Sequence, residues 1–156
     1  MTEMPASPPP PAPAVIGSGP SGPRASFGRR LVALLVDAIL LGIVGAIVRA
    51  IFGQSGGSAI SVAVGLVYFG YLEGSGSGQT VGKRMLGIRV IDFSTGGPIG
   101  FGRGLLRYVG RIASTIVCLL GYFWMLWDKE KQTWHDKIAT TVVVPISHYP
   151  VADWPG

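Results

Sequence analysis

The sequence predicts an α-helical integral membrane protein, and its composition, apolar stretches and charge positions all support this. It has 156 residues, a net charge of +5, 48% hydrophobic residues and 13% charged residues. Soluble domains carry about 25% charged residues, so half the usual solubilising charge is missing. We expect a two-helix transmembrane hairpin, a third short re-entrant or membrane-spanning helical segment, and a small cytoplasmic two-stranded β-element.

The first 26 residues are rich in Pro, Ala, Ser and Gly, and only Glu3 and Arg24 among them are charged. Such a segment buries too little apolar surface to offset its ordering entropy. We therefore expect residues 1–26 to form a disordered cytoplasmic tail, followed by a membrane domain over residues 27–145 and a C-terminal tail over residues 146–156.

Two apolar stretches follow, and we expect transmembrane helices at about 31–52 and 55–72. Eighteen residues separate Arg30 from Arg49, which gives a helix of about 27 Å, close to the hydrocarbon thickness of a bilayer. The Gly-rich connection between the stretches predicts an antiparallel hairpin. Both stretches are apolar nearly all round, which favours lipid over the core of a soluble protein.

Small residues recur at four-residue spacing along the first stretch, a pattern that lets helices pack closely in lipid. The chain's general richness in Gly and Ala is the alternative explanation. These residues are Ala38, Gly42, Ala46 and Ala50.

After the second apolar stretch, the β-branched run from Leu86 to Asp92 predicts a short strand whose partner is the run at 141–145. Pairing them requires both runs on one side of the membrane. The third apolar segment, about 112–127, gives a helix of about 24 Å, which is short for a full crossing. Gly121 interrupts this segment, so we favour re-entry over a third span.

Charge positions predict the orientation. Three arginines precede the first helix and six cations follow the second, while the loop between the helices has none. By the positive-inside rule, the N-terminus is cytoplasmic and the protein is multi-pass.

Arg103, Arg107 and Arg111 recur at i, i+4 and i+8, which places three cations on one helix face. This pattern is typical of an amphipathic helix on an anionic membrane surface, so we expect a lipid-facing basic stripe that binds anionic headgroups. A merely solvated face is the alternative.

Motifs for catalysis are absent from the sequence, and we expect no enzyme, metal site or cofactor. Gly82-Lys83 lacks the rest of a phosphate-binding loop. The two histidines and Cys118 do not have the spacing of a zinc site. Apolar runs too long for a soluble surface separate the arginines, so we expect no nucleic-acid binding.

Asp37 lies about one third of the way along the first helix, where a carboxylate costs about 2.5 to 3.5 kcal/mol to insert and needs a partner. Arg30 is on the same helix side, within 20°, but about 10.5 Å away along the axis. A structural pair that fixes packing and an ion or proton site are both open interpretations.

Three motifs in order resemble the RDD family of small bacterial membrane proteins. They begin at Arg30, Gly78 and His135, and the resemblance covers residues 27–145. It implies a cluster of Arg30, Asp37 and Asp136, with Asp128 as the second choice for the last carboxylate. The other matching motif residues are Gly78, Gln79, Thr80, Gly82, Lys83, Gly87 and His135.

The family resemblance implies a bacterial inner-membrane protein related to transport, with cation or proton exchange at the cluster. Two or three short helices leave little room for a private pathway, so we expect a homo-oligomer. The alternative is an accessory or scaffold protein whose Pro-rich tail binds a soluble partner. Family members often have Ala-Gly-Thr where this chain has Ala139-Thr140-Thr141, which puts a tight turn there in doubt.

We predict that a reporter fused after Pro145 will be cytoplasmic, because the strand at 141–145 must share a side with its partner. A paired phosphatase and fluorescent-protein reporter assay measures this. A reporter that is active outside the cell would show that residues 112–127 cross the membrane.

Overall fold

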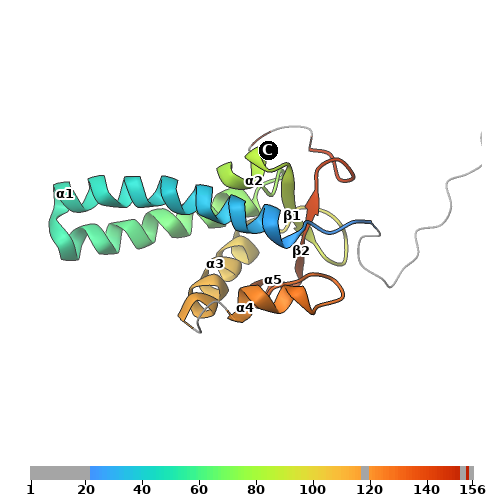
Figure 1. The fold of residues 1–156 in the computed structure, drawn as a ribbon. Coiled ribbons are helices and arrows are strands. Elements are labelled where there is room, and N and C mark those ends of the chain that lie inside the picture. Colours follow the sequence, from blue (N-terminus) through green and yellow to red (C-terminus); the bar gives the residue numbers. More distant parts are fainter. Residues whose placement is uncertain (1–21, 117–119, 152–153, 155–156) are drawn as a thin grey trace, which may run out of the picture.

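The structure, a computed structural model, describes residues 22–116, 120–151 and 154, and most of the expected tail at 1–26 lies outside these residues. It is mostly helical, with one long helical hairpin projecting from a smaller cap built from all later elements (Figure 1). In chain order the elements are α1 (Phe27–Gly74), α2 (Val81–Met85), β1 (Ile88–Asp92), α3 (Gly100–Ile116), α4 (Leu120–Phe123), a 3-10 helix (Trp124–Leu126), α5 (Trp134–Ile138) and β2 (Thr141–Pro145).

α1 folds back on itself at Gly53, whose φ of 74° and ψ of 175° interrupt the helix. The two arms run antiparallel and in close contact: a Cβ on Gly57 would lie 2.5 Å from the Cα of Arg49. The predicted hairpin is therefore confirmed, with a turn tighter than expected. The arms are about 39 Å and 31 Å long at 1.5 Å per residue, and α1 is the one candidate for crossing a membrane among the described residues.

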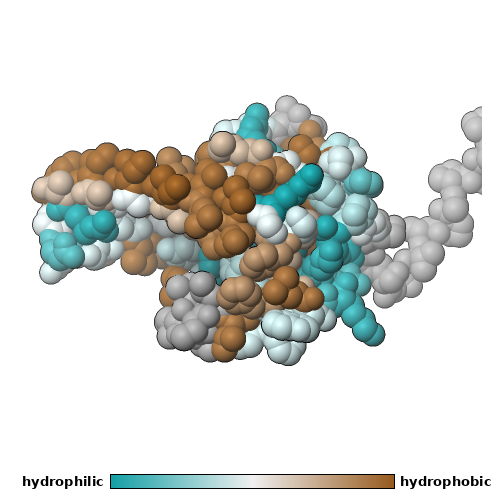
Figure 2. Space-filling view, in the orientation of Figure 1, coloured by the Kyte–Doolittle hydropathy of each residue, from teal (hydrophilic) through white to brown (hydrophobic). Residues whose placement is uncertain are grey.

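The outer surface of the first arm of α1 is apolar, as Figure 2 shows along the upper edge of the hairpin, whereas the tip and the lower arm are partly hydrophilic on this face. A ridge of aliphatic side chains at four-residue spacing is between 52% and 68% exposed: Leu35, Ile39, Ile43, Ile47 and Ile51. The small residues at 38, 42, 46 and 50 are exposed as well, so they do not form the contact between the two arms. This surface has no partner within the described chain.

The two strands pair antiparallel, with Val90 opposite Val143, which confirms the predicted pairing. Every residue of both strands is buried. Ala25 is 2% exposed and donates its backbone N–H to the Val143 carbonyl at 2.9 Å. Ala25, which falls within the expected tail, therefore packs against β2.

The third apolar segment is not one helix over 112–127. Its beginning is the last part of α3, and its end forms α4 and the 3-10 helix, while residues 117–119 lie outside the description. A Cβ on Gly121 would lie 2.5 Å from the Ser114 Oγ, so the chain folds back onto α3 near the predicted interruption.

α5 begins with a capping box in which Thr133 and Asp136 each bond the other's backbone N–H. It ends at a turn where Thr140 has a φ of 52°. The tight turn that the sequence put in doubt is thus present, with a β-branched residue in the left-handed conformation that glycine adopts more readily.

We predict that Thr140→Gly will stabilise the protein by about 1 kcal/mol, because it removes the steric cost of a left-handed β-branched residue. Thermal unfolding in detergent measures the change. Thr95→Gly, in an exposed turn without a positive φ, is the control. A Thr140→Gly melting temperature at or below that of the control would contradict the strain argument.

Candidate functional site: a buried charge layer

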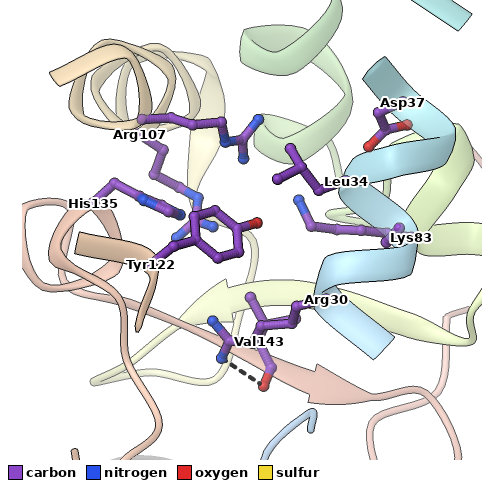
Figure 3. Close-up of a pocket in the computed structure, with 10 residues that line it drawn as sticks. Arg30, Leu34, Asp37, Lys83, Arg107, Tyr122, His135 and Val143 are labelled. Carbon is purple, nitrogen blue, oxygen red and sulfur yellow. Dashed lines mark hydrogen bonds between the residues drawn. The ribbon is translucent and has the colours of Figure 1, made fainter. Parts of the chain in front are cut away.

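Six charged side chains are buried together where α1 meets the cap, and we call them the charge layer. They come from both arms of α1, from α2, from α3 and from α5, and several line one small cavity (Figure 3). The members are Arg30, Glu73, Lys83, Arg107, Arg111 and Asp136.

Asp136 joins the cap to the first arm of α1. Its Oδ2 accepts a hydrogen bond from Arg30 Nη1 at 2.5 Å, and its Oδ1 accepts one from Arg107. Asp136 is fully buried, and burial by itself would raise its pKa. The guanidinium groups of Arg107 and Arg30 outweigh this and hold the pKa of Asp136 well below its ordinary value.

Glu73 has the same role at the end of the second arm. It is fully buried and accepts hydrogen bonds from Arg107 Nε at 2.8 Å, from Arg111 Nη2 at 2.6 Å and from Lys83. Sequence reasoning does not single out Glu73, because it directly precedes a Gly/Ser-rich run. The signal available was three arginines on one helix face, which require carboxylates once they are buried.

Lys83 is the member of the layer that loses its charge most readily. Burial is the largest influence on its amine and, with the repulsion from Arg111 and Arg107, outweighs the attraction of Glu73. Together these influences lower the pKa of Lys83 to about 8. Burial also lowers the pKa of the neighbouring His135 well below its ordinary value, so its ring is neutral.

Asp37 is buried and has no direct hydrogen bond to Arg30 among the described residues, in line with their separation along the helix, although both line the same small cavity. Its carboxylate accepts hydrogen bonds from the Tyr68 hydroxyl at 2.7 Å, from the Thr80 hydroxyl at 2.6 Å and from the Gly82 backbone N–H at 2.8 Å. Donors from the second arm of α1 (Tyr68) and from the segment after α1 (Thr80 and Gly82) thus satisfy the carboxylate.

The motif that begins at Gly78 docks this segment onto α1 and β1. A Cβ on Gly82 would meet the Ala33 carbonyl and lie 2.9 Å from Asp37 Oδ1, so only glycine permits the approach. Other motif residues hold the segment through hydrogen bonds. The Gly78 carbonyl accepts from Val90 N–H, and the Gln79 side-chain amide donates to the Ile88 carbonyl. The Thr80 hydroxyl accepts from Lys83 N–H, and the Gly87 carbonyl accepts from Ile146 N–H. The motif residue His135 lies in α5 beside the charge layer.

Asp128, the second choice for the cluster, pairs instead with Lys137. The carboxylate that meets Arg30 is therefore Asp136.

The expected lipid-facing basic stripe is wrong for two of its three arginines. Arg107 is 1% exposed and Arg111 is 8% exposed, because both turn inward to the buried carboxylates. Arg103 lies at the edge of the cap, where it pairs with Asp92 and donates hydrogen bonds to the backbone carbonyls of Ala139 and Thr140, just after α5. The outward face of α3 is apolar and includes Leu106, Val109 and Ile112.

An apolar hairpin long enough to cross a membrane, anchored by buried Arg–Asp pairs in a small cap, defines a class of helical protein with a candidate membrane anchor. The chain belongs to the RDD family, whose sequence profile matches residues 24–140.

Three relatives of known name are similar over about half of this chain. A Mycobacterium tuberculosis protein named "Proline-rich antigen homolog" is 42% identical over 86 residues, which are 53% of this chain and 35% of the relative. The Mycobacterium leprae "Proline-rich antigen" is 40% identical over 50% of this chain and 31% of its own length.

The third relative, the Bacillus subtilis "Uncharacterized protein YxaI", is 34% identical over 54% of this chain and 55% of its own length. The chain thus covers about a third of the mycobacterial relatives and about half of the Bacillus one. No solved structure matches the chain.

We predict that Arg30→Ala will destabilise the protein by about 3 to 5 kcal/mol, because it leaves the buried Asp136 with one guanidinium fewer. The adjacent Arg29→Ala removes an exposed charge and is the control, with an expected effect within about 0.5 kcal/mol. Thermal unfolding in detergent compares the two. Equal shifts would show that the Arg30–Asp136 pair does not hold the cap to α1.

Proposed function

We propose that the chain is a multi-pass inner-membrane protein that takes part in proton-linked transport as a small homo-oligomer. In this proposal the two arms of α1 cross the bilayer, and the cap lies on the cytoplasmic side with the N-terminus. The observation that carries it is the burial of an amine, Lys83, in the charge layer beside Glu73, Arg107 and Arg111.

Two surface features support the membrane placement. The first is the exposed aliphatic surface of α1. The second is that α3 and the segment after it present apolar and aromatic side chains outward, as Figure 2 shows below the hairpin. Trp124 is 46% exposed and Trp127 is 78% exposed, and tryptophans concentrate where a membrane meets water.

The proposal of proton-linked transport, as opposed to metal-cation transport, rests on the hydrogen-bond partners of the carboxylates and on Lys83. The oxygens of Asp37 and Asp136 already accept hydrogen bonds from buried donors, which leaves little for a bound metal cation. Lys83 can release its proton close to physiological pH, while Glu73 keeps two arginine partners. A titratable group poised near neutral pH is typical of functional sites.

The oligomer rests on the lack of a pathway within one hairpin. The arms lie in close contact at Gly45 and Gly57, which leaves little room for a pathway between them. The exposed small residues at 38, 42, 46 and 50 let another helix approach closely.

An accessory or scaffold role is the second candidate, and the ion pairs of Asp136 favour it, because a fully paired carboxylate also serves as a plain structural clamp. Under this candidate the exposed Arg29 and Arg84 would contact anionic headgroups, and the Pro-rich tail would bind a soluble partner.

We predict that vesicles with the protein will dissipate a proton gradient, and that Asp37→Asn and Lys83→Gln will each lower the flux at least tenfold. A pH-sensitive dye inside the vesicles measures it, with and without a sodium gradient. Arg84→Gln removes an exposed charge from the same short helix and is the control. Each variant is first checked for folding by thermal unfolding.

If the well-folded wild type gives no flux under any gradient, the transport proposal fails. A partner that copurifies with the full chain, but not with a chain lacking residues 1–21, would then favour the scaffold role.

A further inference from the structure

A small cavity lies inside the charge layer and is lined mainly by donors of hydrogen bonds. Its volume is about 10 Å³, which is room for about one water-sized occupant. Figure 3 shows the Lys83 amine and the Tyr122 hydroxyl pointing toward one another across it. The lining residues with polar side chains are Arg30, Asp37, Lys83, Arg107, Arg111, Tyr122 and His135.

Formal charges around this cavity do not balance. Among the described residues that line it or pair directly with its lining residues, four cations face three carboxylates: Arg30, Lys83, Arg107 and Arg111 against Asp37, Glu73 and Asp136. A surplus positive charge in a layer of largely buried side chains is costly. One bound monovalent anion would neutralise it.

Two buried nitrogens of lining residues have no hydrogen-bond partner among the described residues: Arg30 Nε and His135 Nδ1. Thr133 Oγ1 accepts from the Asp136 backbone N–H and lies 3.0 Å from His135 Nε2. We assign the Thr133 hydroxyl as the donor to Nε2, since this gives its own proton an acceptor, and we therefore place the ring proton on Nδ1. Both unpartnered nitrogens are then donors, and what they lack is an acceptor.

We propose that this cavity binds one small monatomic anion, of the class of chloride or bromide, against Arg30, Lys83 and His135. The cavity is too small for the phosphate of a lipid headgroup. The inference names a ligand for the same site as the proposed function and rests on that function only for its physiological use.

Anion and proton binding are then linked at Lys83. The charged groups that face its amine are Glu73 and Asp37 from α1 and Arg107 and Arg111 from α3. Either loss of the amine's proton or arrival of an anion removes the surplus charge. A bound anion therefore holds Lys83 protonated, and a rising pH expels the anion.

The test measures chloride binding to the purified full chain in detergent by titration calorimetry, with gluconate keeping ionic strength constant. We expect saturable binding of about one chloride per chain at pH 7, bromide binding at the same site, and an affinity about tenfold lower at pH 9. Lys83→Gln should weaken binding at least tenfold and abolish the pH dependence, whereas Arg84→Gln should leave both unchanged.

Chloride heats equal to those of gluconate at pH 7 would overturn the inference and leave water as the occupant. Equal weakening by Lys83→Gln and Arg84→Gln would also overturn it. The binding test needs no flux, so chloride binding without proton flux defeats the transport proposal alone. Proton flux without chloride binding defeats only the anion site.

Discussion

The ion pairs of Asp136 with Arg30 and Arg107 are the constraint on which the arrangement of this protein depends. They join residues far apart in the sequence and lie at the one place where α1, α3 and α5 meet. A carboxylate with no exposed surface requires charged partners, because its desolvation costs several kcal/mol. The position of the cap on the hairpin follows from this requirement together with the apolar packing of Ala33 against the two strands.

The same constraint reverses the usual distribution of side chains on α3, since in a helix of a soluble protein the charged face is exposed and the apolar face is buried. Arg107 and Arg111 face the interior, where Glu73 and Asp136 lie, whereas the aliphatic side chains of α3 face outward. This reversal suits a solvent that is itself apolar. In such a solvent a buried ion pair is the stronger restraint on orientation, because apolar contacts with the protein and with lipid are nearly equivalent.

The sequence predicted the elements of the fold well where the signal was local or periodic. The hairpin followed from two apolar runs around a Gly-rich turn, and the strand pairing followed from two β-branched runs. The pairing of Arg30 with Asp136 was anticipated through the family resemblance. The partners of Asp37 were not, because the Tyr68 and Thr80 hydroxyls and the Gly82 N–H lie 31 to 45 residues away and carry no charge pattern.

The arginine face of α3 shows most clearly what the sequence alone does not predict. A spacing of four residues places Arg107 and Arg111 on one side of a helix, but it does not say whether that side meets water, headgroups or buried acids. Only the position of Glu73, reached through the three-dimensional arrangement of α1 and α3, decides this. A pattern of charges thus gives the face, whereas its environment depends on contacts distant in the sequence.

The separation of 106 residues between Arg30 and Asp136 has a consequence for biosynthesis. At roughly 5 to 20 residues per second, a ribosome needs about 5 to 20 s to extend the chain from one to the other. During that interval Arg30 has been translated but its partner Asp136 has not, and Glu73 is translated before its partner Arg107. Until the last strand is made, the root of α1 therefore needs a hydrated environment, because its charged side chains lack the partners that they have in the folded protein.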